Sequence, residues 1–460
     1  MDNLKKNTYM MTATSKTAIR PFSLLAKQLH EIEGSDSIII CEKDVYASYH
    51  KEDVDKDSEN YLFFISPNGD LYHDGAAGDK LVTNVVSKNQ TDSAFKSTVN
   101  GIFKDGFIIS VYRILWNVIM LLKEKRKVLN LLNLYKPKAV IMYSDRKSYF
   151  ELAINKVARE KHISLYMAPV VNHNTKEELL QNPKNFIRVN KDEKKHFLYS
   201  VIEKKYPLYH CEYGNQDVYI YSGYTFWALA ILKMLPPNPW IMGSNYFDKV
   251  GVISKKNYDY YIKSSEETNI QIDVTYMHSV EETEIIRQFK SRNELVSRLK
   301  KEYGLKDGPV VCYALTGYSE TTINITREQV FKNYIIILEQ ILKVYSDVLI
   351  SIHPRIPKCD IHYFEVIPNV HILEEPLYQI VGAVDVFIGF ERSSTQEFIK
   401  YFSYPSVSIT HEMFCSEFDD SMITRILELF KNTKRDVNKD VELYQDDRIN
   451  FCEFLTGIKI

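Results

Sequence analysis

The sequence predicts an α/β protein with two blocks of βαβ units, and three observations lead to that class. Short apolar runs rich in β-branched residues alternate with segments of helical periodicity along the 460-residue chain, which is typical of parallel sheets covered by helices. The alternation occurs twice, on either side of the proline-rich stretch Pro236–Trp240. The composition, with 45% hydrophobic and 26% charged residues, is that of a globular protein large enough to bury two cores.

The first block begins with a strand predicted at Asn7–Thr14, a polar loop at Ser15–Pro21 and a helix at Phe22–Ile32. Residues 50–100 are polar, and only loops and short strands are expected there. The other expected strands of this block are Ser37–Cys41, Ala139–Tyr143, Ser164–Ala168 and Asp217–Tyr221, and the expected helices are Tyr149–Lys161 and Thr225–Met234.

The second block begins near residue 308, after a strand at Val250–Ser254 and a charged helix at Lys290–Tyr303 that ends at Gly304. Its expected strands are Val310–Leu315, Asp347–His353, Val370–Leu373, Asp385–Gly389 and Ser406–Thr410, and its expected helices are Arg327–Val344, Pro376–Val381 and Thr395–Tyr401. We therefore expect a first domain over residues 1–245, a second over 246–440, and a C-terminal helix at 441–460 that can pack back on the first domain.

Composition argues against several classes of protein. Lys and Arg number 58 against 60 Asp and Glu, and the net charge of −2 argues against a dedicated nucleic-acid binder. The six cysteines have no CxxC spacing, so neither a zinc site nor a disulfide framework is expected, and free thiols suit a reducing compartment. The amino terminus has no apolar stretch of signal-peptide length. We expect a cytoplasmic protein without a metal site.

The most apolar segment is Gly106–Leu122, and the basic run Lys123–Lys127 follows it. Arg113 interrupts the segment, which is slightly short for a membrane span. The first interpretation is an amphipathic helix that packs on the domain and ends in solvated basic residues. The alternative is a helix that lies on an anionic membrane surface, which leaves peripheral contact with the inner face of the membrane open.

Three polar sites follow predicted strands of the second block, where ligands bind in open parallel sheets. The tripeptide His353-Pro354-Arg355 follows one strand, the segment Glu391–Thr395 follows another, and a loop that begins with Thr316 and Gly317 follows a third. The sequence contains no GxGxxG, GxxxxGK[ST] or HExxH pattern, so the usual dinucleotide, P-loop and metalloprotease signals are absent.

Each of these sites could contact a phosphorylated ligand. Ser393 and Ser394 precede a predicted helix, where hydroxyls and free N–H groups suit a phosphate, although a serine there can equally be a helix cap. His353 can donate to a phosphate or a carboxylate, and Arg355 can do so bidentately. Glu397 could accept hydrogen bonds from a ribose, or simply favour the helix start as an acidic residue.

The first block offers fewer candidates. Asp145 follows a buried strand and could act as a general base, or cap the next helix. Lys16 and Arg20 in the first βα connection could hold an anionic group of donor or acceptor, with plain surface charge as the alternative. His173 is a weaker candidate, because a lone loop histidine usually has no such role.

Several segments together resemble the GT-B superfamily of glycosyltransferases, within it the enzymes of bacterial capsule and lipopolysaccharide synthesis and the UDP-N-acetylglucosamine 2-epimerases. Ala13–Leu29 is similar to the opening GTRPEAIK segment of the epimerases, and Lys136–Ile163 to their KPD-hydrophobic-GD-helix unit, with Asp145 at the aspartate. The second block, with ISIHPR and VDVFIGFERSSTQEF, resembles their nucleotide-binding half. The pairing of His-Pro with Ser-Ser also resembles bacterial sialyl- and Kdo-transferases that bind CMP-sugars.

The resemblance implies a GT-B fold with two Rossmann-like domains facing across a cleft, and a metal-independent glycosyltransferase without a cofactor. Its substrates would be a nucleotide sugar, with a CMP-linked acidic sugar ahead of a UDP-sugar, and a surface polysaccharide or glycolipid acceptor. Asp145 would deprotonate the acceptor and Arg20 would assist catalysis, while Lys16 and His173 would hold the acceptor or an anionic group. The donor would contact Thr316, Gly317, His353, Arg355, Ser393, Ser394 and Glu397.

Departures from the epimerases favour a transferase. The Arg-Pro of their opening motif is Ser15-Lys16 here, their HRREN signature is replaced by TGYSETT, and their HVEAG segment by MAPVVNHN. An epimerase and a non-catalytic GT-B protein that binds polymer or acts as a scaffold are kept as alternatives. Two observations would distinguish these alternatives. An epimerase acts on a UDP-sugar without an acceptor, and a scaffold protein binds no nucleotide.

Overall fold

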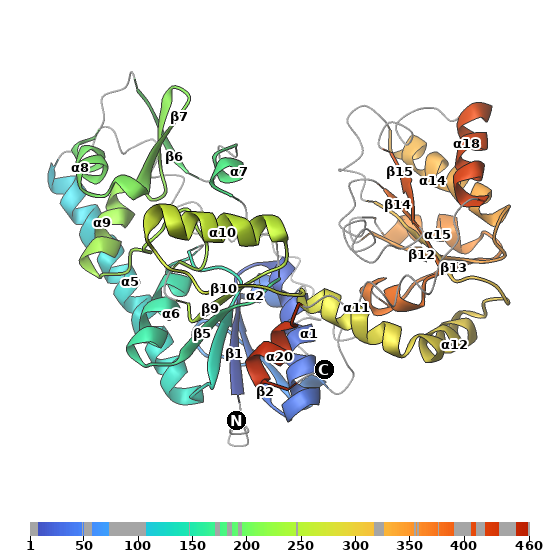
Figure 1. Cartoon of the computed structure of the whole chain (residues 1–460), viewed down its shortest axis with the longest axis horizontal. Helices are drawn as coiled ribbons and strands as arrows, with labels where there is room; N and C mark the ends of the chain where they lie inside the picture. Colours follow the sequence, from blue (N-terminus) through green and yellow to red (C-terminus); the bar gives the residue numbers. More distant parts are fainter. Residues whose placement is uncertain are drawn as a thin grey trace. The chain divides into compact units, whose positions relative to one another are not determined.

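Two parallel sheets organise the chain, one in each of two compact units (Figure 1). Unit 1 consists of Met1–Val280 and Arg448–Ile460, and unit 2 of Glu281–Asp447. The computed structural model describes residues 8–47, 49, 58–72, 107–146, 148–170, 175–181, 186–191, 196–244, 247–316, 326–353, 356, 358–375, 377–390, 406–410, 419–431 and 448–458.

The sheet of unit 1 has seven strands in the order β10-β9-β5-β4-β1-β2-β3, all paired in parallel. The chain moves outward from β1 through β2 and β3 in one direction and through β4 and β5 in the other, so the topological switch point lies between β1 and β4. Residues of β1 and β2 are buried along the whole strand, as expected for a sheet covered on both faces. The strands are β1 (Thr8–Ala13), β2 (Asp36–Cys41), β3 (Leu62–Ile65), β4 (Ala139–Met142), β5 (Ser164–Met167), β9 (Lys249–Val252) and β10 (Val274–Tyr276).

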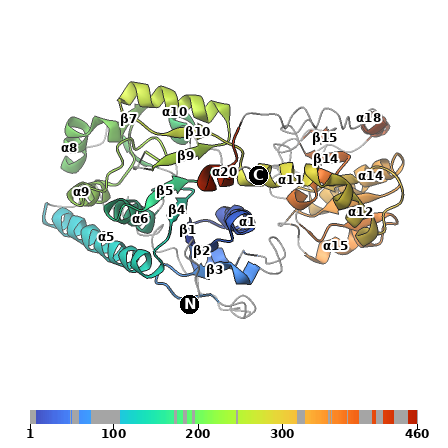
Figure 2. The same ribbon diagram turned by 60° about the horizontal axis from the view of Figure 1, so that its bottom comes forward.

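Helices connect and cover these strands. The longest of the described helices, α5, runs along the outer side of unit 1 and packs on α6 and α9 (Figure 2). The C-terminal helix α20 returns to unit 1 and packs on α1, where the side chains of Phe451 and Cys452 are buried. The connecting helices are α1 (Lys16–Glu33), α2 (Lys43–Tyr46), η2 (Ser58–Asn60), α5 (Phe107–Tyr135), α6 (Tyr149–Glu160), α10 (Lys255–Thr268) and α20 (Phe451–Thr456).

A small antiparallel sheet with the order β6-β8-β7 is inserted between β5 and β9 of unit 1. Strands β7 and β8 form a hairpin whose turn contains Gly214 with a positive φ of 60°, a conformation that favours glycine. The elements of this insertion are α7 (Lys176–Gln181), β6 (Ile187–Asn190), α8 (Phe197–Lys205), η3 (Pro207–Tyr209), β7 (His210–Tyr213), β8 (Gln216–Tyr219) and α9 (Gly223–Ile231).

Unit 2 contains a five-stranded parallel sheet with the order β13-β12-β11-β14-β15. The same outward winding places its switch point between β11 and β14. The strands are β11 (Val311–Ala314), β12 (Val348–Ser351), β13 (Val370–Ile372), β14 (Val386–Phe390) and β15 (Ser406–Ile409). The helices are α11 (Val280–Lys290), α12 (Arg292–Tyr303), α14 (Arg327–Leu342), α15 (Lys358–Glu365), η4 (Leu377–Gln379), η5 (Val381–Ala383) and α18 (Asp420–Lys431).

These strand orders confirm the predicted α/β class with two Rossmann-like units in one chain, as the GT-B class requires. That the units face each other across a cleft stays a prediction. The predicted division after residue 245 differs from the structure, in which unit 1 extends to Val280. The reason is that β9 and β10 extend the first sheet beside β5 instead of beginning the second. The C-terminal segment of unit 1 begins at Arg448 rather than at residue 441.

One predicted local feature is wrong, and one helix is confirmed with a shifted start. The polar loop expected at Ser15–Pro21 is the start of α1, where Ala18 N–H donates to the carbonyl of Ser15 at 3.0 Å. Pro21 lies in the second turn of α1, where a proline lacks the N–H that would donate to the carbonyl four residues earlier. The helix expected over Lys290–Tyr303 is confirmed as α12, which begins two residues later, at Arg292, and ends before Gly304; Lys290 is the last residue of a separate helix, α11.

Candidate functional site

The switch point of unit 1 lies at the carboxyl ends of β1 and β4, where ligands bind in open α/β sheets. Thr14 follows β1 and Tyr143 follows β4, and their hydroxyl oxygens lie 3.0 Å apart. The hydroxyl of Thr14 also donates a hydrogen bond of 2.7 Å to Glu151 Oε1. Side-chain hydrogen bonds therefore join the two strand ends at the place where a ligand is expected.

Glu151 links this network to helix α6. Its Oε2 accepts a hydrogen bond from Ser148 N–H at 3.2 Å, and Ser148 Oγ accepts one from Glu151 N–H at 3.2 Å, which is a capping box. The side chain of Glu151 is fully buried. Sequence reasoning missed this residue, although the spacing of Ser148 and Glu151 before an apolar helix is a recognisable capping signal.

Lys16 and Arg20, predicted to hold an anionic group, both lie on the first turns of α1, directly after β1. Lys16 is exposed and Arg20 is half-buried. The amino terminus of a helix carries a partial positive charge, which the two side chains reinforce near the switch point. The position is suitable for an anionic ligand group, and binding there stays a prediction.

Asp145 lies beyond β4 as predicted, but its carboxylate is fully buried. Arg146 contacts its two oxygens at 2.6 Å and 3.0 Å, and Gly243 N–H donates to Oδ2 at 2.9 Å. The carbonyl of Asp145 accepts a further hydrogen bond from Asn155 Nδ2 at 3.0 Å. Because a general base must reach a substrate hydroxyl, this geometry fits a positioning residue better than the predicted base.

The ion pair between Asp145 and Arg146 holds the proline-rich segment near the end of β4. The guanidinium of Arg146 also donates to the carbonyls of Pro239 and Ile241. Burial lowers the pKa of Arg146, but the Asp145 carboxylate outweighs this effect and raises the pKa above its usual value. The segment Pro236–Trp240, for which the sequence predicted only irregular structure, is thus attached to the carboxyl edge of the first sheet.

A carboxylate that the sequence reasoning missed, Glu42, lies at the same edge of the sheet. It follows β2, whose last residue, Cys41, pairs with Ala13 of β1, so Glu42 and Thr14 are the next residues of two adjacent strands. The residue is exposed, unlike Asp145. Partial desolvation and the nearby Asp44 raise the pKa of its carboxyl, while Lys127 lowers it by less. An acidic residue directly after the predicted strand Ser37–Cys41 was the available signal.

The carboxyl edge of the sheet in unit 2 holds two of the predicted donor residues. Thr316 follows β11, is buried, and its carbonyl accepts a hydrogen bond of 2.5 Å from Tyr334 OH. His353 follows β12, is partly exposed, and its carbonyl accepts the N–H of Ile356 at 2.9 Å. Since β11 and β12 are adjacent and parallel, Thr316 and His353 lie at the same edge of the sheet.

The remaining predicted site residues lie outside the described residues. Ser393, Ser394 and Glu397 come after β14 in the sequence, and the carboxyl end of β14 is at the switch point. The others in this group are Gly317, Arg355 and His173.

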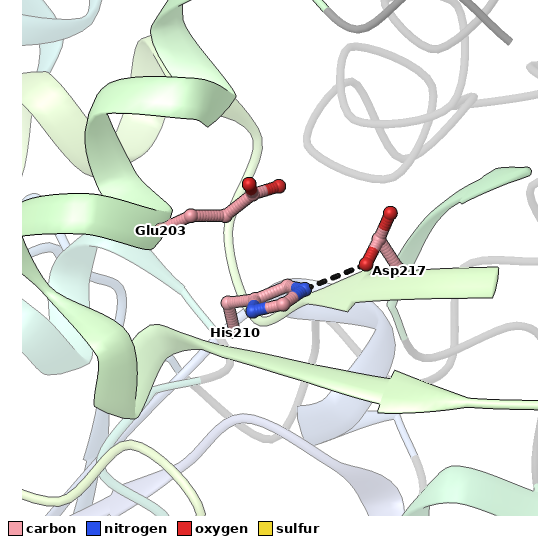
Figure 3. Close-up of side chains that lie close together, drawn as sticks. All are labelled: Glu203, His210 and Asp217. Atoms are coloured by element: carbon pink, nitrogen blue, oxygen red, sulfur yellow. Dashed lines mark hydrogen bonds and ion pairs between the residues drawn. The ribbon is translucent and has the colours of Figure 1, made fainter. Parts of the chain in front are cut away.

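A separate group of ligating side chains lies on the small antiparallel sheet and α8 (Figure 3). One ligand atom each of Glu203, His210 and Asp217 lies within 4.8 Å of the others. His210 Nε2 is 2.9 Å from Asp217 Oδ1, and Tyr219 OH donates to Glu203 Oε1. Burial and the Glu203 carboxylate raise the pKa of Tyr219. The group could hold a cation, but His210 already pairs with Asp217 and Glu203 with Tyr219, and the group lies on neither parallel sheet.

No protein-family model matches the sequence, and no curated protein sequence matches it. Solved structures match over nearly the whole chain. MurG of Acinetobacter baumannii has a TM-score of 0.40 and 10% identity, with 98% of this chain and 99% of that chain covered. UGT2 of Phytolacca americana, complexed with UDP-2-fluoro-glucose and pterostilbene, has a TM-score of 0.42 and 12% identity, with 95% and 94% covered.

The matches also include UDP-GlcNAc 2-epimerase of Neisseria meningitidis bound to UDP-GlcNAc, with a TM-score of 0.40 and 11% identity. The match covers 95% of this chain and 98% of that chain.

Proposed function

We propose that the protein is a glycosyltransferase that moves a sugar from a nucleotide-activated donor to a surface polysaccharide or glycolipid acceptor. The observation that carries the proposal is the strand order, because each unit has a parallel sheet whose switch point is flanked by polar residues. Nucleotides bind at such switch points, where helix amino termini and hydroxyls meet their phosphates.

The donor nucleotide is assigned to unit 2. Thr316 and His353 support this, since both lie at the carboxyl edge of its sheet. The proposal adds the residues expected from sequence, namely Gly317, Arg355, Ser393, Ser394 and Glu397. A CMP-linked acidic sugar is the first donor to test, because of the His-Pro and Ser-Ser pairs, and a UDP-sugar is the second.

The acceptor is assigned to unit 1. In the transfer step the acceptor oxygen forms a bond to the anomeric carbon, the bond from that carbon to the phosphate oxygen breaks, and the nucleotide leaves with the electron pair. The acceptor proton goes to a carboxylate, for which Glu42 is better placed than the buried Asp145. Lys16, Arg20 and His173 hold anionic groups, and the charge on the leaving phosphate is stabilised by basic side chains and helix dipoles without a metal.

Thermal unfolding with saturating CMP, UDP, GDP and dTDP, each alone, tests the proposal. A ligand at about 100 times its dissociation constant stabilises the folded state by about 2.7 kcal/mol. The expected result is a higher midpoint with CMP and a loss of that shift in the Ser393→Ala/Ser394→Ala variant. Ser297→Ala, an exposed serine on α12, is the matched control and keeps the shift.

The other outcomes decide among the alternatives. A shift with UDP alone overturns the CMP assignment, and UDP-sugar turnover without an acceptor would then identify an epimerase. No shift with any of the four nucleotides overturns the glycosyltransferase proposal and leaves a non-catalytic protein.

A further inference from the structure

Helix α5 presents an apolar face to solvent. Eight large apolar side chains on its first four turns are between 38% and 83% exposed. They recur every three or four residues, so they form one continuous stripe along the helix. The residues of this apolar face are Ile108, Ile109, Val111, Tyr112, Leu115, Trp116, Ile119 and Leu122.

The opposite face of α5 already supplies the packing that folding requires. Leu121 and Val128 are fully buried in the core of unit 1, and Ile114 and Val118 pack against it. Ser110 Oγ, also buried, lies 3.2 Å from His196 Nε2 at the start of α8. The exposed stripe is therefore a second apolar face, in addition to the one that holds the helix in place.

The apolar surface continues onto α8. Phe197 is the residue after His196, which contacts α5, and its ring is 44% exposed. Val201, one turn further along α8, is also exposed. Lys204 and Lys205 then end that helix. Both helices thus carry exposed apolar residues followed by exposed lysines.

Charge is distributed unevenly along α5. Within Phe107–Leu122 the only charged residue is Arg113, whose guanidinium lies over the ring of Tyr224 at 5.4 Å. Beyond Leu122, Lys123 and Arg126 are exposed and make no ion pair within the described part of the chain. The first acidic residue of the helix, Glu124, pairs with Lys127 at 2.8 Å. The apolar face therefore ends in a cationic cluster that lacks an acidic counterpart.

We propose that this face docks on an anionic lipid membrane, with α5 lying in the plane of the interface. Lipid provides what the face requires, because acyl chains cover the stripe and anionic headgroups neutralise Lys123 and Arg126. Tyr112 and Trp116 are residue types that favour the headgroup region. The inference rests on exposed residues of unit 1 and does not depend on the proposed function, although a glycolipid acceptor would lie at the same membrane.

The helix lies on the membrane and does not cross it. The stripe from Ile108 to Leu122 is about 21 Å long, shorter than the hydrocarbon core of about 30 Å. No helix in the described part of the chain is long and apolar enough to cross a membrane. Insertion across the bilayer would also pull Leu121 and Val128 out of the core of unit 1.

A second copy of the chain is a poorer occupant of this face. If the apolar faces of two copies met, Lys123 and Arg126 of each copy would lie against the same cations or the apolar stripe of the other. The stripe itself contains no carboxylate that could pair with them. The uncompensated charge would oppose such a dimer. Anionic headgroups supply the missing negative charge.

Vesicle co-sedimentation of the full-length protein tests the proposal. We expect binding to phosphatidylcholine–phosphatidylglycerol vesicles that falls by at least about tenfold in Leu115→Ser/Trp116→Ser, since both side chains are exposed and the core is untouched. Lys123→Glu/Arg126→Glu should lose the preference for anionic over pure phosphatidylcholine vesicles. Val366→Ser, a 77% exposed apolar residue of unit 2, is the control and should bind as the unaltered protein does.

Two results would overturn the inference. One is that the unaltered protein stays in the supernatant with anionic vesicles. The other is that it is a dimer by light scattering which Leu115→Ser/Trp116→Ser converts to a monomer, while vesicle binding does not change. Circular dichroism of each variant verifies that it is folded, and loss of nucleotide binding would bear only on the proposed function.

Discussion

Single residues at the carboxyl edge of the first sheet divide into structural and accessible groups. Asp145 is fully buried and holds Arg146 and the Gly243 N–H, whereas Glu42 is exposed beside Thr14. Glu42 and Asp145 each come shortly after a strand of the parallel sheet, so the local sequence does not distinguish them. Their surroundings differ, since burial excludes the Asp145 carboxylate from solvent and leaves that of Glu42 accessible.

Asp145→Asn should lower the free energy of unfolding by about 3 kcal/mol, because it leaves the largely buried Arg146 without its counter-charge. Glu42→Gln should change it by less than about 0.5 kcal/mol, as for most surface substitutions. Urea unfolding followed by tryptophan fluorescence measures both, since Trp116, Trp227 and Trp240 all belong to unit 1. Equal stabilities of the two variants would contradict the structural role of Asp145.

In a transfer assay, Glu42→Gln should be the more damaging of the two substitutions, although Asp145→Asn is the more destabilising one. Glu42→Gln should lower kcat by about a hundredfold or more if its carboxylate accepts the acceptor proton. Folded Asp145→Asn should retain more activity than Glu42→Gln. An active Glu42→Gln enzyme would rule Glu42 out as the base.

At the scale of elements, glycines and buried ion pairs attach loops to strands. Gly243 has φ of +82°, and a Cβ at this position would lie 2.6 Å from Val250 Cγ2 on β9. The close approach holds the end of the proline-rich segment against the first sheet. In unit 2, Asp347 connects the start of β12 to Lys306 and to His371 of β13.

Gly243→Ala should destabilise unit 1 by about 2 kcal/mol, because positive φ and a steric clash both oppose the new methyl group. Gly214→Ala is the control, with φ of +60° and no atom within 4 Å of the position that its new Cβ would occupy, and should cost about 1 kcal/mol. Urea unfolding monitored by tryptophan fluorescence compares the two variants. If Gly243→Ala costs no more than Gly214→Ala, the segment is not held at this contact.

Asp347 should give unit 2 a pH-dependent part of its stability. Burial alone would raise the pKa of this carboxyl, but hydrogen bonds from Lys306 N–H and His371 outweigh it and lower the pKa below its ordinary 3.8. The folded-state pKa is thus below the unfolded one, so the contribution is complete above 3.8 and is lost as pH falls through the folded-state value. The stability difference between the unaltered protein and Asp347→Asn should therefore shrink as pH falls from neutral into the acid range.

Circular dichroism in urea at a series of pH values measures that difference. Asp307→Asn, which removes a fully exposed carboxylate near the same loop, should show no such trend. If the difference in unfolding free energy between the unaltered protein and Asp347→Asn does not change with pH, the pKa of Asp347 is not lowered by folding.

At the scale of the whole molecule, the chain leaves unit 1 after Val280 and returns to it at Arg448. The returning segment pairs with unit 1 through a bridge between Met277 and Ile449. Phe451 and Cys452 of α20 are buried on α1, and Cys452 Sγ lies 3.3 Å from Gln28 Oε1. Residues 448–458 are therefore part of unit 1.

Truncation after Asp447 should lower the unfolding midpoint of unit 1 and leave unit 2 unchanged. Burial of a phenylalanine side chain such as Phe451 contributes about 1.5–3 kcal/mol. Tryptophan fluorescence reports on unit 1 alone, and circular dichroism reports on both units. Phe451→Ala should reproduce most of the effect and Ile458→Ala, at an exposed position, should not. A fluorescence midpoint unaffected by truncation would contradict this role of α20.

The α/β class, most strands and the polar residues that follow them could be predicted from the sequence alone. These are local properties, since apolar β-branched runs and helical periodicity are encoded within a few turns of chain. The burial of Asp145, the extent of unit 1 to Val280 and the exposure of Glu42 follow from tertiary contacts. They depend on contacts between residues far apart in the chain, such as Asp145 with Gly243, and burial changes what a carboxylate can do without any change in the local sequence.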